Sequence, residues 1–289
     1  MLYLKGTDVK LQNSCVAFGH FDGVHLGHRA VIEALKAEAK KSGLNTVVVA
    51  LEEPGMVLTT PREKQYIIEK LGVDALISVN EAEIECKHCF VKDFILGALD
   101  AKKIVCAEQV FGGKDELKKL AAEDGAEVVE IQDTTLDGEP VNKQAVIQAI
   151  EANDFPKVLK LLGGPYVLIG PVCHGKAEGR QHGMPTANLG FDPTKILPPL
   201  GVYGALSIIE GVRKQGMTNI GRRPSADNMD YISVETNILD FSGDVYDKEQ
   251  ILECHIFIRG VMKFNGLDEV RKQIDKDIEG IKDFLKTII

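Results

Sequence analysis

The sequence predicts an α/β domain followed by an all-β domain. In the first half, short Val- and Ile-rich runs alternate with amphipathic stretches that end at glycine, which indicates a Rossmann-like open parallel sheet with helices on both faces. In the second half, short apolar runs follow one another with turn residues between them, which is typical of an antiparallel barrel or sandwich. A Gly-Gly-Pro breaker at residues 163–165 separates the two patterns, so we expect domains at residues 1–162 and 166–289.

The elements of the first half are predicted from apolar periodicity and from their stop signals. Thr60, Pro61 and Glu63 form a capping box with proline at the first helical position, which opens one of the helices. A stretch at residues 151–162 predicts a helix or a helix pair that is broken near Pro156. Strands are expected at residues 14–18, 45–51, 73–79, 103–107 and 126–131, and helices at 29–41, 60–71, 90–99 and 114–124.

The second half predicts five strands and a C-terminal helix. The strands are expected at residues 166–173, 202–209, 214–219, 231–239 and 251–258. The tail at 267–289 is amphipathic, and we expect it to pack on the barrel or on the first domain, with a dimer seam as the alternative. We expect a monomer or a weak oligomer. The apolar stripe of the tail consists of Leu267, Val270, Ile274, Ile278, Ile281 and Leu285.

Composition narrows the class of protein. The 289 residues carry a net charge of −9, which argues against a general nucleic-acid binder. No signal peptide and no membrane-spanning apolar run is present, so a cytoplasmic protein is expected. Several of the six cysteines lie in apolar runs, which indicates reduced, buried thiols. The pattern Cys86-Lys87-His88-Cys89 suggests half of a zinc site, but no second pair exists to complete it.

A glycine-rich stretch at residues 174–188 is the first candidate site. Its glycines allow the backbone to approach a ligand closely, and two cations lie among them. Pro185 then stiffens the chain, and in an extended segment the side chains of Thr186 and Asn188 point the same way. Their oxygens suit a hard cation such as Mg²⁺, so the stretch predicts phosphoryl transfer. The glycines and cations are Gly175, Gly179, Gly183, Lys176 and Arg180.

The loop at residues 19–28 is the second candidate site. It joins the first predicted strand to the first predicted helix, an order that aims backbone N–H groups and the positive end of the helix at one place. His25 and His28 lie three residues apart there, and their imidazoles could stabilise charge on a phosphorus centre. The alternative is that the two histidines cap the helix.

The second half resembles riboflavin kinases. Pro185-Thr186-Ala187-Asn188 is similar to their P-T-A-N motif, and residues 197–203, 219–225 and 234–241 resemble three further motifs. The resemblance implies a small Greek-key barrel, Glu235 as the catalytic base, and Mg²⁺ on Thr186 and Asn188. Arg259 contacts flavin or phosphate in this interpretation, with a solvated arginine as the alternative. ATP would be held by Gly175, Lys176, Gly179, Arg180, Pro185 and Asn219.

The first half resembles the adenylyltransferase part of prokaryotic riboflavin kinase/FAD synthetase proteins. The sequence Phe-Asp-Gly-Val-His-Leu-Gly-His at residues 21–28 carries the resemblance. It implies that His25 and His28 act in adenylyl transfer from ATP. The residues expected to contact ATP are Gly19, Phe21, Asp22, Gly23 and Gly27.

Three other motifs of that family are altered here. Residues 51–55 lack the histidine of F-x-P-H-P, and residues 107–113 depart from G-x-D-F-x-F-G. In the I-S-S-x-x-I-R motif, Asn142 and Lys143 replace the serines and Ile147 replaces the arginine. Isoleucine offers no donor to phosphate, whereas arginine offers a planar fork of them. The prediction is that adenylyl transfer to FMN is weak or absent.

The predicted function is therefore a riboflavin kinase on an FAD synthetase scaffold. It would convert riboflavin and ATP to FMN and ADP with Mg²⁺. The first alternative is a fully bifunctional enzyme that also makes FAD, with Lys143 compensating for the altered groups. The second alternative is a non-catalytic regulatory protein that binds flavin or nucleotide.

Overall fold

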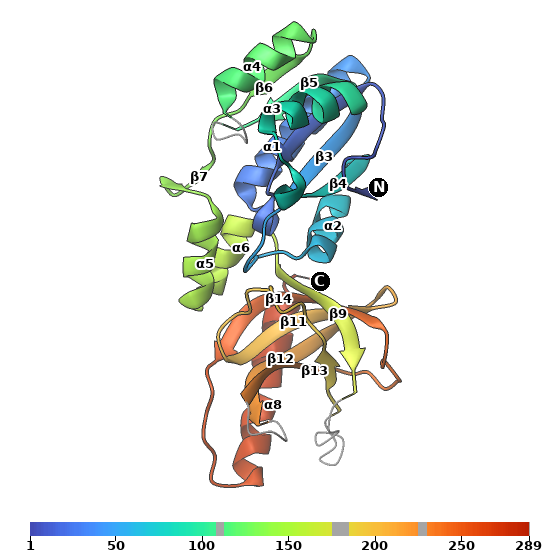
Figure 1. Ribbon diagram of the computed structural model, residues 1–289. Helices are drawn as coiled ribbons and strands as arrows, with labels where there is room; N and C mark the ends of the chain where they lie inside the picture. Colours follow the sequence, from blue (N-terminus) through green and yellow to red (C-terminus); the bar gives the residue numbers. More distant parts are fainter. Residues whose placement is uncertain (108–112, 175–184, 225–229, 289) are drawn as a thin grey trace. The chain divides into compact units, whose positions relative to one another are not determined.

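The computed structural model describes residues 1–107, 113–174, 185–224 and 230–288 (Figure 1). The chain forms two compact units, Met1–Val146 and Ile147–Ile289. The division lies earlier than the Gly-Gly-Pro breaker at residues 163–165. The physical reason is that helix α6 (Phe155–Leu162) packs against strands β9 (Tyr166–Cys173) and β14 (Glu249–Arg259) of the second unit.

The first unit is a parallel sheet with helices on both of its faces. The sheet order is β1-β4-β3-β2-β5-β6, and every pairing in it is parallel. Its strands are β1 (Leu2–Lys5), β2 (Ser14–Gly19), β3 (Asn45–Glu52), β4 (Ala75–Asn80), β5 (Ala101–Cys106) and β6 (Glu127–Glu130). Its helices are α1 (Leu26–Ser42), α2 (Pro61–Lys70), α3 (Lys87–Cys89), the π-helix η3 (Phe90–Ala98) and α4 (Lys114–Glu123). Short turns η1 (Asp22–Val24) and η2 (Glu81–Glu83) and the hairpin β7 (Thr135–Leu136) and β8 (Glu139–Pro140) complete it.

The alternating side chains of the strands bury two apolar faces. Val47, Val49 and Leu51 share one core with η3 and α4, while α1 packs on strands β2, β3 and β5. The strand order reverses at β2, because β3 and β4 follow on one side of it and β5 and β6 on the other. In open parallel sheets a ligand binds beyond the carboxyl ends of the strands at such a switch point. The loop at residues 20–25 follows the carboxyl end of β2.

The predicted parallel sheet is confirmed, and several details differ from expectation. Edge strand β1 and helix α5 (Lys143–Glu151) were not predicted. The predicted helix at 90–99 is a π-helix. Pro156 does not break a helix, because it lies in the first turn of α6, where its missing N–H costs nothing. The capping box of α2 is present as predicted.

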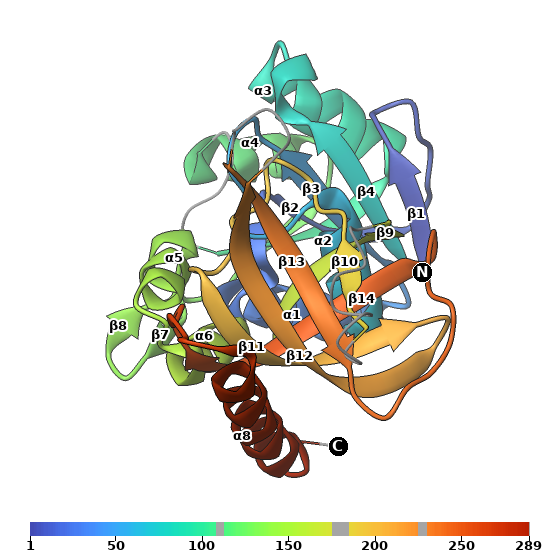
Figure 2. The ribbon, with the colours of Figure 1, turned by 90° about the horizontal axis from the view of Figure 1, so that it is seen from below.

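The second unit is a closed antiparallel barrel (Figure 2) with the order β10-β13-β12-β11-β14-β9. Strands β11, β12 and β13 are joined as hairpins, and β14 returns to pair with β11, which is a Greek key. The three-residue strand β10 was not predicted, and β12 extends well beyond its predicted bounds. Besides β9 and β14, the barrel consists of β10 (Ala187–Leu189), β11 (Gly201–Ile209), β12 (Val212–Pro224) and β13 (Asp230–Ile238).

The C-terminal helix α8 (Leu267–Leu285) packs on the barrel of its own unit. Ile281 and Leu285 are fully buried in one cluster with Leu206 and Leu239, and Ile278 packs against that cluster. Of the two packing partners expected for this helix, the barrel and the first domain, the structure shows the barrel. The side of α8 that carries these residues follows the predicted 3.6-residue period.

The cysteines differ from the expectation of reduced, buried thiols. Cys15, Cys106 and Cys254 are free and buried, but Cys173 is exposed, and Cys86 and Cys89 form a disulfide. Within the described ranges, no helix is long and apolar enough to cross a membrane.

Candidate functional site

Strand pairing in the barrel brings the predicted kinase residues together. Asn188 on β10 and Asn219 on β12 both pair directly with Glu235 on β13, so the three lie in one row across the sheet. The Thr186 hydroxyl donates to Glu235 Oε2 over 3.4 Å. Thr186, Asn188 and Glu235 therefore converge, as the kinase interpretation requires.

Neighbouring residues hold this row in place. The Ser233 hydroxyl donates to Glu235 Oε1 over 2.9 Å, and Glu235 is 7% exposed. The Asn237 amide donates to the carbonyl oxygen of Pro185 over 2.9 Å, which fixes the start of the Thr186 segment. Ser233 was missed in the sequence, although its i, i+2 spacing from Glu235 places it on the same face.

A cavity of about 460 Å³ opens beside the row. Pro185, Thr186 and Asn188 border it on one side, and the loop at residues 241–246 borders it on the other. Thr186 and Asn188 place oxygen ligands on its wall, and the buried Glu235 is hydrogen-bonded to the first of them and paired with the second. Those are the parts that a phosphate-bound cation and a reacting alcohol would need.

The other predicted residues of this half have different surroundings. Gly175, Lys176, Gly179 and Arg180 lie outside the described residues. The guanidinium of Arg259 donates from Nε to Asp277 Oδ2 over 2.8 Å and from Nη1 to the Gly260 carbonyl over 3.1 Å. The side chain of Asp277 is 1% exposed. Arg259 is thus held against helix α8 by an ion pair, and its flavin contact stays a prediction.

The second cavity lies at the switch point of the parallel sheet and measures about 760 Å³. Gly19 at the end of β2 and Cys106 at the end of β5 line it, together with the loop that carries the two histidines. All five residues expected to contact ATP here border the cavity or belong to that loop. Those that line it are Gly19, Phe21, Asp22 and Gly27.

The loop after β2 is strained and firmly held. Phe21 and Val24 have φ of 50° and 43°, and a β-branched residue such as Val24 rarely adopts a positive φ. Asp22 offsets this strain because its carboxylate accepts from the backbone N–H groups of Leu58 and Thr59, at 3.1 and 2.8 Å. Such strain is retained where the surrounding structure fixes a functional conformation.

His25 and His28 stack in this loop, with ring centroids 3.7 Å apart. Burial lowers the pKa of His25 to about 4 and that of His28 well below its usual value, so both are neutral at pH 7. His25 Nδ1 accepts from the His28 N–H at 3.4 Å, which leaves Nε2–H of His25 as a donor. His25 is also the residue that caps α1, whereas His28 lies within the first turn of that helix.

His28 Nδ1 is buried and has no hydrogen-bond partner within the described part of the chain. Buried polar atoms are nearly always paired, and an exception needs an explanation. His28 also lines the cavity, so its ring lies at the wall beside which a substrate would bind.

Of the described residues, Lys143 is one of two lysines that line this cavity, together with Lys114. Its ammonium lies 2.9 Å from Asp22 Oδ2 and 2.9 Å from Glu53 Oε1. Burial alone would lower the pKa of Lys143, but these two carboxylates raise it overall, so the charge persists. Asn142 caps α5 through its side chain, which accepts from the Ala145 N–H at 2.9 Å. Both residues line the cavity where the family motif has serines.

One further cluster at this edge could hold a cation. His20, Glu53 and Glu81 bring their ligand atoms within 4.8 Å of one another. His20 Nε2 already lies 2.8 Å from Glu81 Oε2, and Glu53 is bonded to Lys143. These contacts compete with a metal ion for the same atoms.

The buried His25 predicts a loss of stability in acid. Its pKa is about 4 in the folded protein, against 6.5 in an unfolded chain. Because the folded pKa is the lower one, the contribution is complete above pH 6.5 and is lost as the pH falls towards 4. The loss is about 3 kcal/mol. Between pH 7 and 4 the melting temperature should fall less steeply for His25→Asn than for the parent protein. Equal slopes for the two proteins would contradict the burial of a neutral imidazole.

Comparison with known proteins identifies both halves of the chain. Residues 8–145 match the family model of FAD synthetase, and residues 162–285 match that of riboflavin kinase. The bifunctional riboflavin kinase/FMN adenylyltransferase of Bacillus subtilis is 32% identical over 91% of this chain and 90% of its own length. That of Listeria monocytogenes is 32% identical over 94% of this chain and 92% of its own.

The fold defines a nucleotidyltransferase-type sheet joined to a riboflavin kinase-type barrel. The chain belongs to the family of bifunctional riboflavin kinase/FMN adenylyltransferases. A solved structure of a macrolide-efflux protein from Streptococcus pneumoniae has the same fold, with a TM-score of 0.83, 24% identity, and coverage of 98% and 99% of the two chains. The family membership makes the protein an ATP:riboflavin phosphotransferase.

Proposed function

We propose that the chain is a bifunctional enzyme that makes FMN from riboflavin and then FAD from FMN. The unit Ile147–Ile289 would carry the kinase and the unit Met1–Val146 the adenylyltransferase. The observation that carries the proposal is the convergence of Thr186 and Asn188 on Glu235, together with the histidine loop in the sheet unit. The bifunctional relatives support the same conclusion.

In the kinase step, Glu235 accepts the proton of the riboflavin 5′-hydroxyl as its oxygen attacks the γ-phosphorus of ATP. The bond from that phosphorus to the bridging oxygen breaks, and ADP leaves. Ser233 holds the carboxylate of Glu235 in orientation through its 2.9 Å hydrogen bond. The oxygens of Thr186 and Asn188 would hold Mg²⁺, which when bound offsets the charge of the ATP phosphates.

In the adenylyl step, a phosphate oxygen of FMN attacks the α-phosphorus of ATP and pyrophosphate leaves. The Nε2–H of His25 and the ring of His28 face this chemistry as neutral donors, and the start of α1 adds its N–H groups. Lys143 contributes the cation that the missing arginine would otherwise supply. Because Lys143 keeps its charge and lines the cavity, we favour the bifunctional enzyme over one with a degraded first half.

The experiment for this proposal starts from riboflavin. The purified chain is incubated with riboflavin, ATP and Mg²⁺, and the flavins are separated by chromatography over time. FMN is expected first and FAD later. FMN that accumulates without FAD would indicate that the altered motifs have disabled the first half, and binding of flavin without ATP consumption would indicate a regulatory protein.

Removing the Thr186 hydroxyl should weaken the kinase and raise its Mg²⁺ requirement. Thr186→Val keeps the shape of the side chain but removes one oxygen ligand and the 3.4 Å hydrogen bond to Glu235. We expect the rate of FMN formation to fall about tenfold at limiting Mg²⁺ and to recover partly at high Mg²⁺. Magnesium titration of the initial rate measures this. A rate and a magnesium midpoint equal to those of the parent would remove Thr186 from the cation site.

A further inference from the structure

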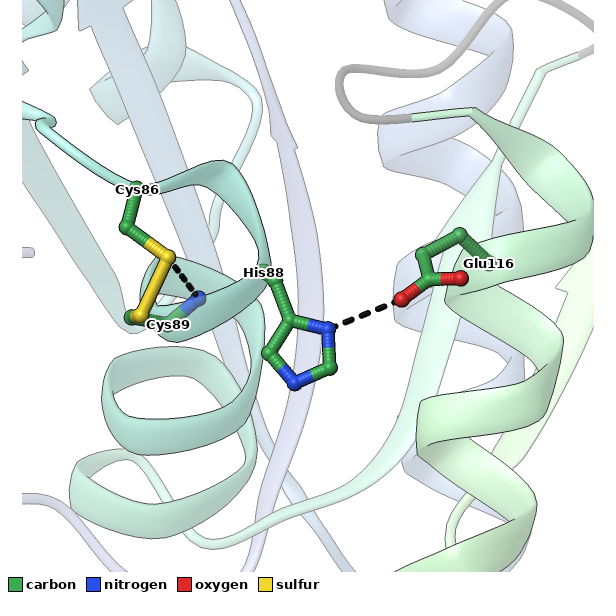
Figure 3. The surroundings of a disulfide bond; sticks show 4 residues. All are labelled: Cys86, His88, Cys89 and Glu116. Atoms are coloured by element: carbon green, nitrogen blue, oxygen red, sulfur yellow. Dashed lines mark hydrogen bonds and ion pairs between the residues drawn. A yellow bond between two sulfur atoms is a disulfide. The ribbon is translucent and has the colours of Figure 1, made fainter.

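Cys86 and Cys89 form a disulfide across one helical turn (Figure 3), and neither of them lines the two cavities described above. They begin the continuous helical stretch of α3 and η3. Cys89 is exposed and Cys86 is half-buried. The disulfide is therefore reachable from solvent, unlike the buried thiols of Cys15 and Cys106.

A cross-link this short does little for stability. A disulfide stabilises mainly by restricting the unfolded chain, and that effect grows with the length of the loop it closes. The sequence separation here is three residues, which is close to the minimum. The disulfide therefore adds little to the stability of the fold. A role in thiol–disulfide exchange explains its presence better.

The position of Cys86 favours release of its sulfur as a thiolate. Cys86 is the residue that caps the helix, and its Sγ accepts from the backbone N–H of Cys89 at 3.1 Å. The start of a helix stabilises negative charge, and a better-stabilised thiolate leaves faster in exchange. Next to it, His88 Nδ1 lies 2.8 Å from Glu116 Oε1, which anchors the turn to the first part of α4 (Figure 3).

The other thiols of the first unit lack these features. Burial raises the pKa of Cys15 to about 11 and also raises that of Cys106, so both are poor nucleophiles at neutral pH. Exchange in this unit should therefore be confined to the pair at 86 and 89.

We infer that Cys86–Cys89 is a thiol–disulfide exchange site that is reduced by a dithiol. A thiolate of the dithiol attacks the exposed Cys89 Sγ, the bond between the two cysteines breaks, and Cys86 leaves as the thiolate held by the Cys89 N–H. The second thiol of the reductant then attacks the mixed disulfide and releases Cys89. Two electrons and two protons pass to the protein, and the reductant becomes a disulfide.

The test uses the oxidised full-length chain without any flavin, so it does not depend on the proposed function. One arm adds dithiothreitol, and the other adds a small amount of thioredoxin with its reductase. Each is quenched with excess N-ethylmaleimide at neutral pH, and the peptides are measured by mass spectrometry while circular dichroism monitors the fold. We expect both cysteines to be labelled together in the folded protein, with Cys15 and Cys106 unlabelled, and oxidised glutathione to restore the bond.

Two results would overturn the inference. Labelling that requires denaturant would make the bond structural, and labelling before any reductant would mean that the pair does not form. Reduction in the thioredoxin arm points to a protein dithiol, and reduction by dithiothreitol alone points to a small dithiol; both support the site. Cys173→Ser, which removes the exposed free thiol of the second unit, is the control variant and should leave the result unchanged.

The order of attack is tested with a monothiol. After brief exposure to glutathione and rapid quenching, we expect glutathione on Cys89 and maleimide on Cys86. The reverse distribution would contradict the assignment of Cys86 as the leaving thiolate.

Discussion

Replacement of Glu235 by glutamine is expected to lower the rate of FMN formation by about 10²- to 10⁴-fold, the usual contribution of a general base. Glutamine keeps the size of the side chain and can still accept from Ser233, but it cannot take the proton of the riboflavin hydroxyl. Riboflavin and ATP binding should change little. The measurement is the single-turnover rate of FMN formation, with FAD formation from FMN as an internal reference.

Glu210→Gln is a suitable control for this variant. Glu210 is in the same barrel unit, is exposed, and pairs with Lys248 rather than with any residue around Glu235. It should keep the parent rate. If Glu235→Gln kept the parent rate as well, Glu235 would not be the base, and the row would have to act by binding alone.

Replacement of His28 by alanine is expected to lower FAD formation from FMN by about 10²- to 10³-fold, the cost of losing a donor aimed at developing charge. The imidazole of His28 stacks on His25, and its Nδ1 is buried without a partner within the described ranges. The alanine variant loses this ring as a donor and also loses the stacking contact that holds His25. The rate of FMN formation should remain that of the parent, since the kinase residues lie in the other unit.

His88→Ala is the matched control, because this histidine belongs to the same unit but is exposed and pairs with Glu116. Its adenylyl rate should be unchanged. A thermal melt of both variants separates lost chemistry from lost folding. An unchanged adenylyl rate in folded His28→Ala would exclude the stacked pair as the transition-state donors.

Local patterns were enough to predict most of the fold. The capping box at Thr60 and the glycine stops gave helix positions that the structure confirms, because such signals act within a few residues. Strand β10 escaped prediction because three residues carry no periodicity, and β1 because its run is short. The disulfide was missed because cysteine spacing does not reveal oxidation state.

The site was predictable to a smaller extent. The spacing of Thr186 and Asn188 indicated oxygen ligands on one face, but a glutamate on an alternating strand is usually a surface residue. Glu235 was identified through family resemblance, and its burial depends on pairing with Asn188 and Asn219, which are distant in sequence. The same holds for Asp22, whose partners Leu58, Thr59 and Lys143 come from remote segments.

The most direct test of the bifunctional account supplies FMN as the sole flavin, with ATP and Mg²⁺, and measures pyrophosphate release against FAD formation. The account predicts that pyrophosphate and FAD appear in equal amounts, at a rate that His28→Ala lowers and Glu235→Gln does not. The bifunctional account would be contradicted if FMN stayed unchanged and no pyrophosphate formed, in a preparation that still converts riboflavin to FMN.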